Sequence, residues 1–164
     1  MGAVLVEGLL NRSYCLRFLI LVFIVGTSST GCIPMTDYQP NERAVQNLGM
    51  PEAWQRFRAV MLRAVNPQIQ AVQLTEDGIM YSGTRLLPMF VQVPAGRLMA
   101  FTNISGVDVY ANHTVYVKGA VGQATDIFVL ASDQDAKTFA DLLMSFRSQY
   151  LRDRASFQSP PTPR

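Results

Sequence analysis

The middle of this chain, residues 68–131, alternates short apolar runs with turn-forming residues, and this pattern limits its fold most strongly. Valine, isoleucine, tyrosine and threonine recur at a spacing of two, which is typical of strands that bury one face. Turn signals interrupt the runs at 75–78, 94–96 and 104–106. The predicted strands are 68–74, 79–82, 84–93, 97–103, 107–112, 113–118 and 124–131. Six or seven short strands of this kind predict a small antiparallel sheet or barrel.

A proline lies inside the third of these runs, 84–93, whose sequence is TRLLPMFVQV. Proline has no backbone N–H to donate to a neighbouring strand. Pro88 therefore predicts a bend or a sheet edge at this point.

An amphipathic helix is predicted before the strands, over residues 50–65. Pro51 suits the first turn, and Glu52 suits the positive end of the helix dipole. Apolar residues recur on one stripe at helical spacing: Ala53, Trp54, Phe57, Val60, Met61 and Ala64. The stripe either packs on the domain or forms a docking face for a partner or a membrane surface.

A second helix is predicted after the strands, over residues 136–150, so the fold class is α+β. Its core-facing stripe holds Phe139, Leu142, Leu143, Phe146 and Tyr150. Residues 132–135, Ser-Asp-Gln-Asp, are interpreted as its cap, because serine and aspartate oxygens accept hydrogen bonds from the free amides of a first turn. The alternative, that Asp133 and Asp135 form a catalytic pair, is the weaker interpretation.

The order of these elements resembles the pleckstrin-homology-like domain, over about residues 68–150. The segment from Asp126 to Arg147 is similar to the last strand, capped turn and closing helix of that family, and 74–83 resembles its first hairpin. The resemblance implies a barrel plugged by the C-terminal helix, which binds a peptide or protein along an exposed sheet edge. It does not imply phosphoinositide binding, because the first hairpin carries Glu76 and Asp77 where phosphate binding needs cations.

The N-terminus has the layout of a secretory signal. Arg12 and Arg17 precede eight consecutive apolar residues, 18–25, and small polar residues follow. The apolar run is shorter than the roughly 20 residues that span a bilayer. A cleaved signal peptide is therefore predicted over 1–31, and an uncleaved anchor helix is the alternative.

The residues that end this segment, Ser29-Thr30-Gly31-Cys32, resemble the lipobox of bacterial lipoproteins. The resemblance implies that Cys32 becomes the lipid-modified first residue of the mature chain, although Ser29 replaces the usual leucine. Two or more acyl chains hold a protein firmly on a membrane. Ile33, in place of an aspartate, is compatible with transfer to the outer membrane. The alternative is that Cys32 is an incidental free thiol.

The rest of the chain divides by composition. Residues 32–48 hold two prolines and many polar residues, so a tether is predicted there, with a helix starting near its end. The domain is predicted over 49–151. Residues 152–164 include three prolines and are predicted to be a disordered tail.

Catalytic and ligand-binding motifs are absent from the sequence. His113 is the single histidine, no nucleophile motif accompanies it, and its position predicts a turn. No glycine-rich phosphate loop, metal-ligand spacing or cofactor motif is visible. The net charge of +2 gives no reason to expect a nucleic-acid partner.

The sequence therefore predicts a lipid-anchored protein of the bacterial cell envelope, held at the outer membrane and facing the periplasm. It predicts a non-catalytic module without a cofactor, which contacts the membrane through its lipid and binds another protein. The alternative is a periplasmic lipoprotein that carries a lipid or small ligand, which requires an apolar cavity inside the domain.

Overall fold

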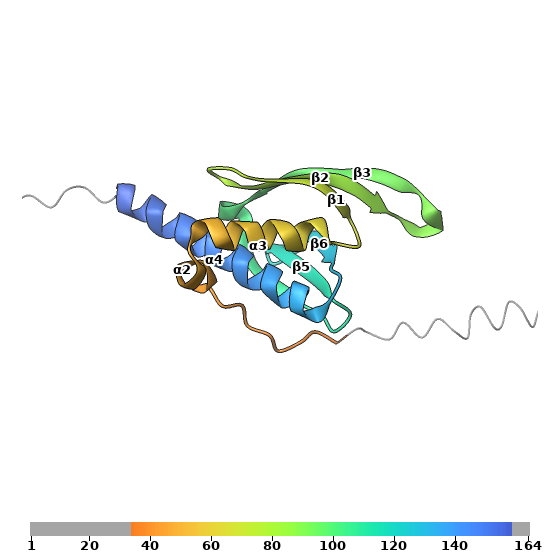
Figure 1. Cartoon of the computed structure of the whole chain (residues 1–164), viewed down its shortest axis with the longest axis horizontal. Coiled ribbons are helices and arrows are strands. Elements are labelled where there is room, and N and C mark those ends of the chain that lie inside the picture. Colours follow the sequence, from red (N-terminus) through yellow and green to blue (C-terminus); the bar gives the residue numbers. More distant parts are fainter. Residues whose placement is uncertain (1–33, 159–164) are drawn as a thin grey trace, which may run out of the picture. The chain divides into compact units, whose positions relative to one another are not determined.

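The computed structural model describes residues 34–158, and side chains as far as residue 156. The signal peptide predicted over 1–31, Cys32 and the last residues of the predicted tail lie outside the described residues. Figure 1 shows helices on one side of a long hairpin, with a second sheet behind them. The elements are α2 (Ala44–Leu48), α3 (Met50–Leu62), β1 (Gln68–Leu74), β2 (Gly78–Leu86), β3 (Gln92–Ala100), β4 (Ile104–Val109), β5 (Thr114–Gly119), β6 (Ala124–Val129) and α4 (Asp133–Gln158).

The six strands form two antiparallel sheets of three strands each, in the orders β1-β2-β3 and β4-β5-β6. The α+β class is confirmed, but the prediction of a barrel is wrong, and so is the seventh strand. Among the described residues no strand ladder joins the two sheets, and Asn66, just before β1, forms only an isolated bridge with Val129 of β6. Closure of a barrel needs a continuous ladder, which depends on long-range pairing that local sequence does not encode.

The strand count differs because β2 and β3 form one long hairpin. Strand β2 continues to Leu86, and β3 begins at Gln92, so Pro88 lies in a short 3₁₀ turn, Pro88–Phe90, between them. The turn predicted at 94–96 is wrong, since Pro94 pairs with Thr84 inside the ladder. Strand β3 is at the edge of its sheet, where the missing N–H of a proline is tolerated. The turn predicted at 104–106 is also wrong, because β4 begins at Ile104.

Both amphipathic helices pack on the domain, which is the first of the two interpretations given for 50–65 and the prediction made for 136–150. Four members of the α3 stripe are buried within the helix, and a fifth is buried just after it. Phe57 of α3 lies 5.2 Å from Phe139 and 5.7 Å from Phe146 of α4, measured between ring centroids. Phe139 also lies 5.1 Å from Phe128 of β6. These aromatic contacts join both helices to the second sheet in one core.

The cap predicted for α4 is confirmed. The Asp135 backbone amide donates to the Ser132 hydroxyl oxygen at 3.1 Å, which satisfies one free donor of the first turn. The helix continues to Gln158, so residues 152–158 extend α4 where the sequence predicts the start of a tail.

The segment predicted as a tether lies against the domain over residues 34–48. Thr36 donates to the Val109 carbonyl from both its amide and its hydroxyl, and so lies along the edge of β4. The Tyr38 hydroxyl and the Asn41 amide both donate to Asp141 of α4, at 2.5 and 2.7 Å. Helix α2 follows at Ala44–Leu48, as the sequence predicts for the end of this segment.

Candidate functional site

The outer face of the first sheet is an uncharged, open surface. Ile79 and Tyr81 of β2 point into the core, so their neighbours Met80 and Ser82 point outward. Met80 pairs with Leu98 of β3, and the two side chains are 45% and 46% exposed. The outward-facing residues that line the centre of this face are Ala71, Gln73, Met80, Ser82, Pro94, Gly96 and Leu98. None of them carries a charge, and no described element covers them (Figure 1).

The same face contains an open hollow with a volume of about 780 Å³. Gly96 contributes to the hollow because it pairs with Ser82 but has no side chain to raise the surface there. A β-carbon at Gly96 would come within 2.8 Å of the Tyr81 carbonyl oxygen, so the close approach of β2 and β3 at this point requires glycine. The arrangement suits an apolar partner surface rather than an ion.

The tip of the β2–β3 hairpin, residues 86–91, is the most exposed apolar segment of the described chain. Its sequence is Leu-Leu-Pro-Met-Phe-Val, and Met89 and Phe90 are 88% and 89% exposed. Both have a positive φ, 66° and 61°, a conformation that costs about 1–2 kcal/mol for residues other than glycine. The turn closes with the Leu87 amide donating to the Val91 carbonyl at 2.8 Å. The backbone thus holds two large apolar side chains in solvent at some cost in stability.

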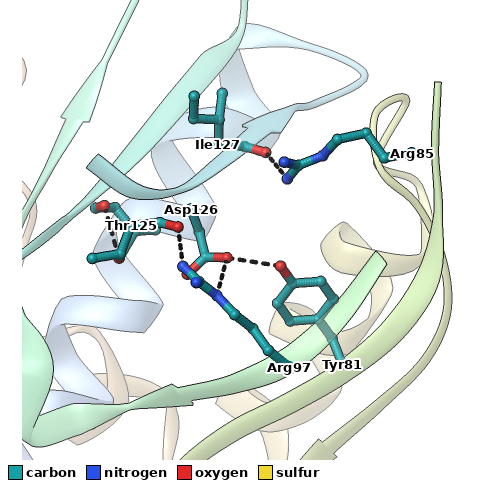
Figure 2. Close-up of polar contacts among 7 residues, drawn as sticks. Tyr81, Arg85, Arg97, Thr125, Asp126 and Ile127 are labelled. Atoms are coloured by element: carbon teal, nitrogen blue, oxygen red, sulfur yellow. Dashed lines mark hydrogen bonds and ion pairs between the residues drawn. The ribbon is translucent and has the colours of Figure 1, made fainter. Parts of the chain in front are cut away.

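A buried carboxylate, Asp126, connects the two sheets. Figure 2 shows its side chain between Tyr81 of β2 and Arg97 of β3. The Tyr81 hydroxyl donates to Oδ1 at 2.7 Å, and Arg97 donates through Nε to Oδ1 at 2.8 Å and through Nη2 to Oδ2 at 2.6 Å. Asp126 is only 5% exposed. Its two oxygens accept from three donors, which leaves little capacity for a substrate.

The environment of Tyr81 favours its neutral form. Burial raises the pKa of Tyr81 well above its usual value, and the hydrogen bond to Asp126 and the negative charge of that carboxylate raise it further. A tyrosine of this kind is a poor general base at neutral pH. The cluster is therefore suited to joining the sheets rather than to acid–base chemistry.

The free edge of β6 is occupied along its length. The Val129 amide and carbonyl bond to the backbone at 65–66. Arg85 donates to the Ile127 carbonyl at 3.2 Å, and Arg97 donates to the Thr125 carbonyl (Figure 2). Side chains from the first sheet thus take the place of a neighbouring strand. Peptide binding along an exposed edge, as the family resemblance implies, therefore does not fit β6.

The polar residues singled out in the sequence do not converge on one site. His113 occupies the predicted turn between β4 and β5, and its Nδ1 lies 2.6 Å from Asp133. Asp135 pairs instead with Arg63 at 2.6 Å. Because each acid has its own partner, a catalytic pair formed by Asp133 and Asp135 does not exist in this arrangement.

Other ligand classes find no further support in residues 34–158. No group of histidine, cysteine, aspartate and glutamate side chains in this range is placed to hold a metal ion. None of the helices in the described range is long and apolar enough to cross a membrane. Comparison of the chain with protein-family models, with curated proteins and with solved structures gives no match.

Two features of the surface were not predicted from the sequence patterns. The apolar run 84–93 reads as a strand, although the proline at its centre is a signal for a turn that exposes its apolar neighbours. In the sequence, the residues of the outer face look like the solvent-facing positions of ordinary alternating strands. Its uncharged composition becomes evident only when β1, β2 and β3 are placed side by side.

Proposed function

We propose that this protein is a lipid-anchored, non-catalytic module of the bacterial cell envelope that binds another protein through the outer face of the β1-β2-β3 sheet. The anchor is a lipid on Cys32, and the module faces the periplasm from the outer membrane. The observation that carries the proposal is the Met80–Leu98 pair, half exposed at the centre of a hollowed face whose outward-facing side chains carry no charge.

The chemistry of this face favours a protein partner. Monomeric proteins rarely leave a contiguous apolar surface uncovered, and such surfaces commonly mark interaction sites. Met80 is unbranched and adaptable, which suits a contact surface. Gln73 and Ser82 supply hydrogen-bonding groups on this face without a fixed charge. The partner surface should therefore be apolar at its centre and neutral.

The packing of the interior favours binding at the surface over carriage of a ligand inside the domain. A carrier needs an enclosed apolar cavity. The space where α3 and α4 meet the second sheet is filled instead by Phe57, Phe128, Phe139 and Phe146, which are 0–2% exposed. An enzyme needs polar groups that converge on an open cleft, whereas Asp126 already accepts three hydrogen bonds from its own neighbours.

The anchor is supported by the sequence around Cys32 and is tested separately from the face. The lipobox resemblance assigns the lipid to this cysteine, and Ile33 after it is compatible with the outer membrane. A Cys32→Ser variant should leave the membrane fraction. If that variant is cleaved after residue 31 and sediments with membranes as fully as the wild type, the anchor is wrong.

The binding face is tested by photocrosslinking in intact cells. A photoreactive amino acid in place of Ser82, at the centre of the face, should yield one discrete crosslinked species. The same amino acid in place of Asp153, which is exposed on α4, should not. A Met80→Lys and Leu98→Lys double variant should abolish the species while folding normally. Equal crosslinking from both positions, or a species that persists in the double variant, would contradict binding of the partner at this face.

A further inference from the structure

The described chain starts close to the residue that would carry the lipid. Pro34 is two residues after Cys32, and a chain spans at most about 3.6 Å per residue. Pro34 is itself fixed to the domain, because its carbonyl accepts from the Ala111 amide at 3.2 Å. A lipid on Cys32 would therefore hold the turn around Ala111 within roughly 10 Å of the membrane surface.

Residues 35–48 add no slack to this connection. Met35 forms a bridge with Tyr110, and Tyr38 and Asn41 bond to Asp141. The Val45 amide donates to the buried hydroxyl of Ser145 at 2.8 Å. A free tether of this length would let the domain move tens of ångströms from the bilayer. The docked segment instead keeps one end of the domain at the membrane.

The exposed hairpin tip belongs to the same end of the domain. Figure 1 shows the β2–β3 turn and the first described residues toward the right of the view, away from the C-terminal end of α4. A series of hydrogen bonds and short chain links connects them. It passes in order through Pro34, Ala111, His113, Leu130, Val129, Asn66 and Leu86.

We infer that the hairpin tip, residues 86–91, inserts into the lipid bilayer that holds the anchor and so gives the domain a second membrane contact. The inference rests on the proposed lipid at Cys32. Three observations point to a bilayer as the occupant. The tip is a narrow projection rather than a groove, all six of its side chains are apolar, and it lies at the anchored end. Such a projection can enter the interface between head groups and acyl chains without a matching surface.

The two contacts together fix the orientation of the domain. One contact at Cys32 would leave rotation about the anchor free, whereas a second contact at Met89 and Phe90 removes most of that freedom. The outer face of β1-β2-β3 then stands at a defined angle to the membrane, where a partner can reach it. The anchor and the tip thus present the proposed binding face.

A matched control lies at the opposite end of the domain. Val121 is 88% exposed, as apolar as the tip residues, and lies in the β5–β6 turn. Strand β5 runs from the His113 turn to Gly119, so this turn lies at the end away from Pro34. Position 121 therefore reports on an exposed apolar site that the inference leaves in water.

The test places a fluorescent amino acid at position 90 or at position 121 of the full chain, purified from membranes and reconstituted into zwitterionic vesicles. Mass spectrometry of the same sample first establishes whether Cys32 carries lipid. Burial of a methionine and a phenylalanine favours the inserted state about tenfold or more. Iodide in the buffer should therefore quench the probe at 90 about tenfold less than the probe at 121. Quencher-labelled lipid should reach position 90 alone.

Each result decides a separate claim. A lipid on Cys32 with a water-exposed probe at 90 overturns the inserted tip and leaves the proposed function standing. Lipid quenching at both positions also overturns it, since the orientation would then be undefined. Protection of position 90 from iodide without quenching by lipid shows that a second copy or another protein covers the tip, which is again contrary to the inference. If Cys32 carries no lipid, the proposed function fails, whatever the probe reports.

Discussion

The hydroxyl of Tyr81 donates to Oδ1 of Asp126 across 2.7 Å, from β2 of the first sheet to β6 of the second. The two residues are 4% and 5% exposed, so the bond lies in the interior. Arg97 neutralises the carboxylate from β3 at 2.6 Å. A charged group joins the two sheets where a barrel would have a backbone ladder.

Replacement of Asp126 by alanine should destabilise the fold. It leaves the Tyr81 hydroxyl without its partner in the interior and removes the counter-charge of Arg97. Loss of one member of a buried charged hydrogen-bonded group costs about 2–4 kcal/mol, toward the lower value here because Arg97 is half exposed. Urea unfolding measures the change. The matched control is Glu52→Ala, which removes an exposed pair with Arg56 and a favourable charge at the helix N-terminus and should cost less than about 1 kcal/mol. Equal effects would mean that Asp126 does not join the sheets.

Stability should fall in alkaline solution because two tyrosines have raised pKa values. Burial and the neighbouring Asp126 raise the pKa of Tyr81, and burial and Asp141 raise the pKa of Tyr38. Unfolded tyrosine ionises near pH 10. The stabilisation is therefore complete below pH 10 and is lost as the pH rises toward the folded pKa.

The size of this effect can be measured at Tyr81. Each pH unit above 10 should remove up to about 1.4 kcal/mol of unfolding free energy through this residue. Urea unfolding between pH 9 and 11 should show a shallower decline for Tyr81→Phe than for the wild type. An unchanged slope would contradict the assignment.

Removal of the Asp141 carboxylate should loosen the segment before α2. Asp141 accepts from Tyr38 and Asn41 and is the main polar contact of that segment with α4. Hydrogen exchange of residues 35–43 should accelerate at least about tenfold in Asp141→Ala, because each of the two lost bonds to a charged acceptor is worth about 1.5–3 kcal/mol. Exchange of β5 and β6 should not change. Asp153→Ala, on the same helix, is the control and should leave the segment protected.

A polar residue in the hairpin tip should be at least as compatible with the fold as the exposed apolar residue that it replaces. Phe90 has a φ of 61°, which asparagine adopts more readily. Phe90→Asn should therefore leave the unfolding free energy unchanged or raise it by about 0.5 kcal/mol. Thermal unfolding measures this. A loss of more than about 1 kcal/mol would mean that Phe90 packs on the domain and is not free to meet a membrane.

The elements of this fold were predictable where the pattern is local. The stripes through Phe57 and Phe139 follow from helical spacing, and the cap at Ser132 follows from residue type. The acid at position 126, inside the most apolar strand, was a signal that a buried partner must exist. Its partners, Tyr81 and Arg97, are distant in sequence, so the pattern could not identify them.

Other features depended on context that the sequence lacks. Pro94 and Gly96 have the composition of a turn, yet an edge strand accepts both. Residues 34–48 have the composition of a linker, yet the hydrogen bonds to Asp141 and Ser145 hold them on the domain. The long-range pairing of the sheets likewise decides that they remain open.

The lipid at Cys32 underlies the proposed location, orientation and role, and mass spectrometry of the protein extracted from membranes tests it most directly. We predict an N-terminal peptide that begins at Cys32 and is heavier by the mass of a diacylglyceryl group, with or without a further acyl chain. A chain that still contains residues 1–31 and has an unmodified thiol at Cys32 would contradict the proposal.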